Sequence, residues 1–126
     1  MIVFRTFPSV PESVPTARHF VAEAIPDAPR DIGERAQMLV SELATNAVRH
    51  AQTEFIVRVE LDASRLCVEI IDAGLGTPTL RATAAHELSG RGLRIVDVLA
   101  DSWGVRESSP GPGKSVWFVL ALPEHA

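Results

Sequence analysis

Two strand-like segments joined by a link of only a few residues constrain the fold of this chain more than any other feature. Phe55 to Leu61 alternates apolar side chains with Arg58 and Glu60. Leu66 to Ile71 is nearly all apolar. These patterns predict a half-buried strand and a central strand. The link at residues 62–64 makes the two strands an antiparallel hairpin, because parallel neighbours need a crossover of a dozen or more residues.

Similar patterns predict the remaining elements. The expected strands span residues 2–7, 103–107 and 115–122. We expect a first helix capped by Ser13 and stopped by Pro26, a long helix from the cap Asp31 to about Ala51, and a helix over 91–100. This order predicts an α+β fold: a two-layer α/β sandwich with a mixed, mostly antiparallel sheet and about three helices on one face. A doubly wound parallel sheet would need helices that are missing here.

Composition limits the classes of function. The 126 residues match one domain, 1–126. A net charge of −4 argues against direct nucleic-acid binding. No apolar stretch approaches the ~20 residues that cross a bilayer, and the N-terminus does not resemble a signal peptide. We therefore expect a cytoplasmic protein without a membrane partner. Its single cysteine, Cys67, excludes an internal disulfide and is expected to be a buried structural thiol.

The long predicted helix carries a polar stripe beside its apolar side. Helical projection groups Ala36, Leu39, Leu43 and Ala47 on the apolar side. The neighbouring stripe holds Arg35, Glu42, Asn46 and Arg49. Glu42 and Asn46 are one turn apart, so a carboxylate and a carboxamide share one edge that can hold a hydrated hard cation and orient a nucleophile. A solvated helix face with charge pairs is the alternative.

A second polar element follows the central strand directly. Asp72 falls on the same side of that strand as Val68 and Ile70. A carboxylate buried there needs a hydrogen-bond donor, such as an adenine amine. Gly74 and Gly76 would let the backbone approach a base closely. The alternative is an ordinary strand-to-turn aspartate with turn glycines.

Two further glycine-rich segments complete the pattern. Ser89 to Val96 enters the helix expected at 91–100, where backbone N–H groups suit phosphate and Arg91 or Arg94 can assist. Gly111 to Phe118 leads into the last strand, and Ser115 is expected near the strand of Asp72.

The order and spacing of these four segments resemble the GHKL (Bergerat-fold) ATPases, which include histidine-kinase-like ATP-binding domains. Glu42 to His50 looks like their N box, and Asp72 to Gly76 their first glycine box. Gly90 to Leu93 resembles the second glycine box, and Gly111 to Phe118 the last. Within this class the chain is similar to the short bacterial anti-sigma-factor serine/threonine kinases.

The resemblance implies roles for individual residues. Asn46 would coordinate Mg²⁺, which bridges the ATP phosphates, and Glu42 would be the general base. Asp72 would accept a hydrogen bond from the adenine amine, with Ser115 supporting it through water. The implied nucleotide-binding set is completed by residues near the base or the phosphates: Arg49, His50, Gly74, Gly76, Gly90, Arg91, Gly92 and Leu93. The chain departs from the longer sensor kinases in a short ATP lid at about 77–90, in Arg94 where those kinases place glycine, and in Ser115, where threonine is commoner.

The resemblance also implies an activity and partners. The chain would be an ATP-binding regulatory protein that transfers the γ-phosphate to a serine or threonine of a small antagonist of an anti-sigma factor. A non-catalytic module that sequesters a sigma factor with bound ATP is the alternative, since binding and transfer use nearly the same residues.

Two other patterns need separate interpretation. Gly113-Lys-Ser115 resembles the end of a P-loop. The first glycine of such a loop would stand at position 108, which is Ser108, and a strand rather than a helix follows Lys114.

The last strand is apolar on both faces, so the Trp117 side is expected to contact a second copy or a partner. A satellite core under the N-terminal strand is an equal alternative.

Overall fold

A computed structural model of the chain describes residues 1–50, 53–72, 93–107 and 113–123. The described residues form five strands and three helices. The strands are β1 (Ile2–Phe7), β2 (Phe55–Leu61), β3 (Arg65–Asp72), β4 (Ser102–Glu107) and β5 (Lys114–Ala121). The helices are α1 (Ser13–Ala24), α2 (Arg30–His50) and α4 (Leu93–Leu99).

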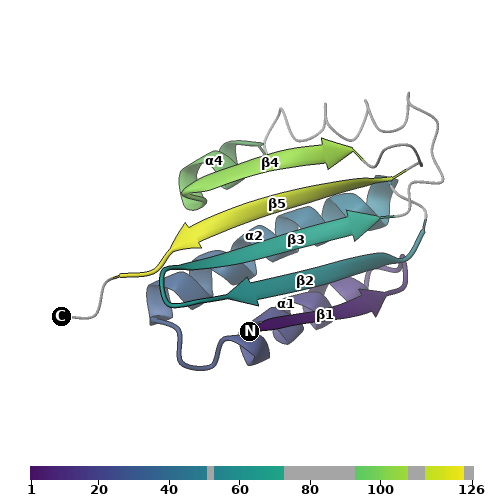
Figure 1. Cartoon of the computed structure of the whole chain (residues 1–126). Helices are drawn as coiled ribbons and strands as arrows, with labels where there is room; N and C mark the ends of the chain where they lie inside the picture. The colour runs from purple at the N-terminus through teal and green to yellow at the C-terminus, as the bar shows by residue number, and fades with distance from the viewer. Residues whose placement is uncertain (51–52, 73–92, 108–112, 124–126) are drawn as a thin grey trace.

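The strands form one sheet in the order β1-β2-β3-β5-β4, and each neighbouring pair is antiparallel. Figure 1 looks onto the open face of this sheet, with α1 and α2 behind it. The predicted α+β two-layer sandwich is therefore confirmed. The three-residue hairpin link between β2 and β3 is also confirmed: Asp62 accepts hydrogen bonds from Ser64 and Arg65, and those from Ser64 are the main cause of its lowered pKa.

The core lies between the helices and the face of the sheet that they cover. Alternate residues of the three central strands are buried there: Phe55, Val57, Val59, Leu66, Val68, Ile70, Val116, Phe118 and Leu120. The predicted apolar side of α2 meets them, since its four members are all buried: Ala36, Leu39, Leu43 and Ala47. Apolar residues that recur every two positions in the strands and every 3.6 positions in α2 thus account for the buried core between the two layers.

Both predicted helix caps are wrong. Ser13 is the first residue of α1, and its Oγ donates to the Pro8 carbonyl at 2.6 Å. Asp31 lies within the first turn of α2, where its carboxylate accepts from Arg35 Nη1 at 3.4 Å. Each side chain has found a partner other than the helix's own N–H groups, and an acid in a first turn still interacts favourably with the helix dipole.

The other boundaries shift by one or two residues where they can be compared. β3 extends the prediction by one residue at each end, and β4 and β5 each begin one residue early. The described part of α4 covers 93–99 of the expected 91–100. Position 51, where the long helix was expected to end, is outside the described residues.

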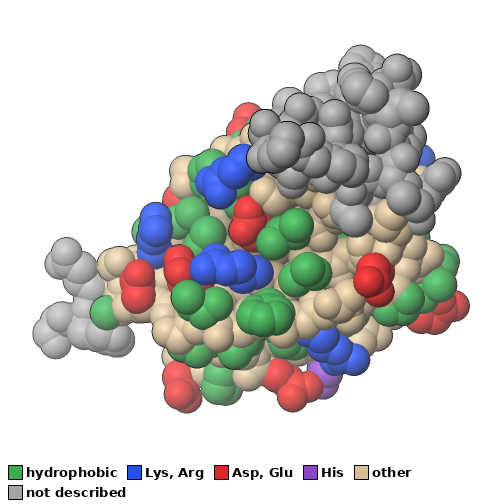
Figure 2. Space-filling model, turned by 45° about the vertical axis from the view of Figure 1, so that its right-hand side comes forward, with side chains coloured by type: hydrophobic (Ala, Val, Ile, Leu, Met, Phe, Trp, Pro, Cys, Tyr) green, Lys and Arg blue, Asp and Glu red, His purple; other side chains and the backbone are tan. Residues whose placement is uncertain are grey.

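The open face of the sheet mixes charge with apolar surface. Figure 2, which views the molecule obliquely, shows basic and acidic side chains interspersed with hydrophobic ones. Trp117 is half-buried on this face, with its ring against Gly104 of β4. Because β2 and β3 separate β1 from β5, the N-terminal strand does not cover Trp117, and the satellite-core alternative is wrong. A second copy or partner on this face stays a prediction.

Cys67 also differs from its expected burial. It is half-buried rather than buried, because it alternates onto the open face between Glu60 of β2 and Val119 of β5. Desolvation nevertheless raises the pKa of its thiol. Among the described residues, no helix is long and apolar enough to cross a membrane.

Gly104 and Gly33 give opposite stability predictions. A Cβ atom at Gly104 would lie 2.7 Å from Cζ2 of Trp117, so Gly104→Ala must displace the indole ring. We expect a loss of about 1–3 kcal/mol in the free energy of unfolding. Gly33 is helical and has open space around it, so Gly33→Ala should gain up to about 1 kcal/mol. Urea unfolding measures both; an unchanged Gly104→Ala variant would contradict the packing of Trp117.

Candidate functional site

The polar residues predicted for the site gather at one end of the sandwich. Figure 1 shows the C-terminal half of α2 behind the end of β3 and the start of β5, and α2 contacts both strands. Glu42 and Asn46 lie on that half of α2, Asp72 is the last residue of β3, and Ser115 is the second residue of β5. Three segments that are far apart in the sequence therefore place their polar residues at the same end of the sandwich.

Asp72 faces the helix layer. It follows Val68 and Ile70 in the alternation of β3, and only 6% of its surface is exposed. A carboxylate at this depth is costly unless polar groups satisfy it. Asp72 is not without a partner, but its oxygens offer about four acceptor positions in all. The Asp72 carboxylate is thus a buried hydrogen-bond acceptor at the end of β3, where the core meets the polar edge of the sandwich.

The residue opposite Asp72 on β5 is Lys114. The register pairs Asp72 with Lys114 and Ile71 with Ser115. Ser115 is buried, but the alternation of β5 directs it to the sheet face opposite to that of Asp72. The structure therefore brings Ser115 to the neighbouring strand, as expected, while placing a different side chain directly across from the acid.

Sequence reasoning missed Lys114 as a residue of the site. The signal was present: Leu120, Phe118 and Val116 mark the buried side of β5, and two further residues toward the N-terminus reach position 114. Its exposed fraction is only 8%. The alternation of β5 therefore places Lys114 on the buried side, which its position in a P-loop-like sequence does not suggest.

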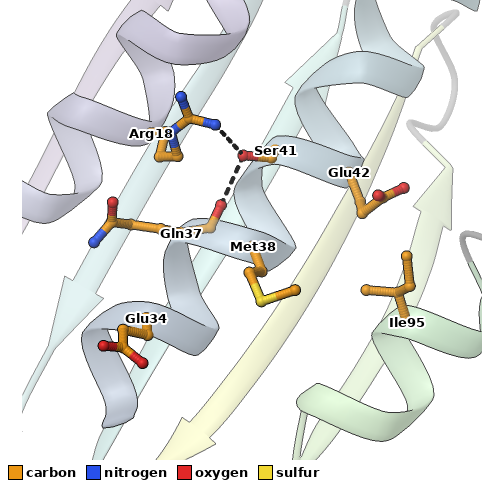
Figure 3. Close-up of a pocket in the computed structure, with 7 residues that line it drawn as sticks. All are labelled: Arg18, Glu34, Gln37, Met38, Ser41, Glu42 and Ile95. Atoms are coloured by element: carbon orange, nitrogen blue, oxygen red, sulfur yellow. Dashed lines mark hydrogen bonds between the residues drawn. The ribbon is translucent and has the colours of Figure 1, made fainter. Parts of the chain in front are cut away.

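Glu42 and Asn46 are both half-buried on α2, one turn apart as expected. Glu42 borders an open groove of about 520 Å³ between α1, α2 and α4. Figure 3 shows its carboxylate on the α4 side of α2, above Ile95. Farther along α2, Arg49 is exposed and His50 is half-buried as the last residue of the helix.

A hydrogen-bond chain fixes the α1 side of this groove. Arg18 of α1 donates to Ser41 Oγ at 3.1 Å, and Ser41 donates in turn to the Gln37 carbonyl at 2.9 Å (Figure 3). The exposed Met38 lies between this chain and Ile95. The groove thus has a polar side on α1 and an apolar side on α4, with Glu42 at its edge.

Arg35 sets the direction of α4. Its Nε and Nη2 donate to the carbonyl of Leu99, at 3.0 and 2.6 Å, and Nη2 also lies 3.7 Å from Asp101. A cation on the last carbonyls of a helix satisfies unpaired acceptors and favours the dipole. Because Leu99 lies near Arg35 and Ile95 near Glu42, α4 runs antiparallel to α2. Its first residue, Leu93, therefore lies toward the Asn46 end. The sequence placed Arg35 on the polar stripe but assigned it no role.

Several predicted residues lie outside the described part of the chain. These are Gly74, Gly76, Gly90, Arg91 and Gly92, together with the expected lid at about 77–90. Leu93 is described only as the first residue of α4. The predicted site residues that the structure does describe with their side chains are Glu42, Asn46, Arg49, His50, Asp72 and Ser115.

The described side chains fit a nucleotide with magnesium. Asp72 offers a buried acceptor for a base amine, and the Asn46 carboxamide supplies an oxygen of the kind that Mg²⁺ prefers. Among the described residues, no group of three or more His, Cys, Asp or Glu side chains could hold a metal. Mg²⁺ in nucleotide sites is generally held by one or two protein oxygens together with substrate phosphates.

Fold and site together define an α+β domain of the GHKL ATPase type. The family model for the histidine kinase-like ATPase domain matches residues 7–120. The chain belongs to this family, and that membership supports an ATP-binding regulatory function. No curated protein is significantly similar to the chain.

Arg35 and Arg30 test how α4 is held. Arg35→Met removes two charge-assisted hydrogen bonds to Leu99, so we expect the free energy of unfolding to fall by about 1.5–3 kcal/mol. Arg30→Met is the control, because that side chain is 92% exposed and pairs only within α2, with Glu34. Its effect should stay within about 0.5 kcal/mol in the same urea titration. Equal effects of the two variants would contradict the role of Arg35.

Proposed function

We propose that this protein binds Mg²⁺ and ATP and transfers the γ-phosphoryl group to a serine or threonine hydroxyl of a small antagonist protein, as an anti-sigma-factor kinase. The observation that carries the proposal is the convergence of Glu42 and Asn46 on α2 with the buried Asp72 at the end of β3. Membership of the histidine kinase-like ATPase family supports the ATP-binding part.

Each residue has a distinct task in this proposal. Asp72 accepts a hydrogen bond from the adenine amine and so selects the base. Asn46 supplies a carboxamide oxygen to the magnesium ion. Glu42 accepts the proton of the incoming hydroxyl, as a general base does in phosphoryl transfer. ATP supplies the phosphoryl group that is transferred.

The groove beside Glu42 supports access by a protein substrate. It is open to the surface, and its lining combines Arg18, Glu34 and the exposed Met38. A peptide segment lying there could present a hydroxyl to Glu42, while Asn46, one helical turn further along α2, would hold the magnesium ion. Positioning of this kind, with charge neutralisation, supplies most of the catalysis in phosphoryl transfer.

The alternative is a non-catalytic module that sequesters a sigma factor or another regulator while ATP is bound. It uses the same contacts to the base and the metal. The two functions therefore separate only at the step in which Glu42 takes part.

Nucleotide affinity tests the binding site. Asn46→Ala should weaken magnesium-dependent ATP binding about 10- to 100-fold, because a metal ligand is lost. Asp72→Asn should weaken ATP binding by a similar factor and lower the preference for ATP over GTP, because the base loses a charged acceptor. Isothermal titration calorimetry with and without Mg²⁺ measures both effects.

Thr45→Ala is the matched control for these binding measurements. Thr45 is exposed next to Asn46 and bonds only to the Ser41 carbonyl, so its loss should leave affinity unchanged. Native ATP affinity in both the Asn46 and Asp72 variants would exclude the proposed site.

Phosphate transfer tests the catalytic step. Glu42→Gln keeps the shape of the side chain but removes the base, so γ-labelling of candidate antagonist proteins from labelled ATP should fall about 10²- to 10⁴-fold. Glu34→Gln is the control, because Glu34 lines the same groove about two turns earlier on α2. Unchanged labelling in Glu42→Gln would remove Glu42 from its role. Intact ATP binding without transfer to any antagonist would favour sequestration.

A further inference from the structure

Lys114 is the only lysine of the chain and is buried. A buried ammonium group is expensive unless an opposite charge or several acceptors compensate it. Lys114 is not without a partner. The identity of its neighbours therefore decides what this cation does.

The register places Lys114 directly opposite an acidic residue of β3. Asp72 of β3 is its partner on one side, and Glu107 of β4 holds the register position on the other. Lys114 and Asp72 both belong to the helix-facing side of their strands, and they are 8% and 6% exposed. Directly opposed side chains on one sheet face have Cβ atoms about 4.5–5.5 Å apart. The side chains of a lysine and an aspartate thus start from neighbouring positions in a largely buried place.

Among the described residues, Lys114 is the only lysine or arginine that is buried. The partner of Asp72 on β2 is the apolar Phe55. At this end of the sandwich α2 also carries a permanent cation, Arg49, but that side chain is exposed rather than buried. Lys114 is therefore the cation that β5 supplies to Asp72.

The backbone before Lys114 assists this placement. Gly113 has a φ of 115°, in the left-handed region that favours glycine. β5 begins with the next residue, so this turn ends where Lys114 enters the ladder opposite Asp72.

We propose that Lys114 is the internal counter-ion that keeps Asp72 ionised and aligned as the acceptor for the 6-amino group of adenine. This role rests on the proposed function of Asp72 and makes Lys114 a positioning residue for base selection. Without the ammonium group, a carboxylate at this depth takes up a proton rather than remain an isolated charge. A neutral acceptor forms a weaker bond to the amine, because charge-assisted hydrogen bonds are roughly twice as strong as neutral ones.

Purine riboside 5′-triphosphate, which lacks the 6-amino group, isolates this interaction. The native protein should bind ATP about 10- to 100-fold more tightly than this analogue. In Lys114→Met the preference should fall below about threefold, while affinity for the analogue changes little, because the lost bond is one that the analogue never makes. Calorimetric titration of both nucleotides gives the ratio, which a merely structural role of Lys114 would not move.

Arg106→Met is the matched control. Arg106 lies on the adjacent strand β4, on the open face of the sheet, and its Nη1 lies 3.8 Å from Glu69 Oε2. Removal of this cation should leave the preference for ATP intact. An unchanged or increased preference in Lys114→Met would overturn the proposal; an increase would mean that the lysine competes with the base for Asp72.

Folding of the variants gives a second, nucleotide-free test. In a double-mutant cycle of urea unfolding, Lys114→Met should cost much less in the Asp72→Asn background than in the native chain. If Lys114→Met fails to fold while the double variant folds, the counter-ion role is supported. Additive effects, or failure of both while Asp72→Asn folds, would overturn it. If the native protein binds no ATP, the proposed function fails, and this cycle still decides whether Lys114 neutralises Asp72.

Discussion

The packing of α2 on the centre of the sheet is the contact on which the rest of the structure depends. Its apolar side, with Leu39 and Leu43, is buried against β3 and β5. On the side of α2 next to this apolar side, the packing leaves Glu42 and Asn46 half-buried at the border of the core. The same helix holds α4 through Arg35. A single hydrophobic contact thus fixes the groups of the proposed phosphate side relative to the strands that carry the proposed base side.

The sequence was sufficient for features that depend on periodicity. Alternation predicted the strands and the inward direction of Asp72, and the three-residue link required the β2–β3 hairpin. Helical spacing predicted the buried side of α2. These patterns are reliable because burial of apolar area is the largest favourable term in folding, and it acts on every residue of a repeating face.

Features that depend on a single tertiary partner could not be predicted in the same way. Ser13 and Asp31 carry good capping side chains, but the carbonyl of Pro8 and the guanidinium of Arg35 bind them instead. The hydrogen bonds from Arg35 to the Leu99 carbonyl join residues 64 positions apart, and no local sequence pattern specifies such a contact. Lys114 follows glycine and proline, a context typical of an exposed turn, and only the register with β3 shows that it is buried opposite Asp72.

Stability alone does not account for an acid and a base at this register position. A buried ion pair pays a large desolvation cost, and well-packed hydrophobic residues in its place are often neutral or stabilising. The preceding pair along the same face is Ile70 with Val116, so the strands already support an apolar ladder there. The change from apolar to charged pairing occurs at the end of β3, where the core meets the polar edge of α2. In the proposed site, the lysine and the aspartate at that boundary would serve a ligand instead, as an acceptor whose charge does not depend on the ligand's arrival.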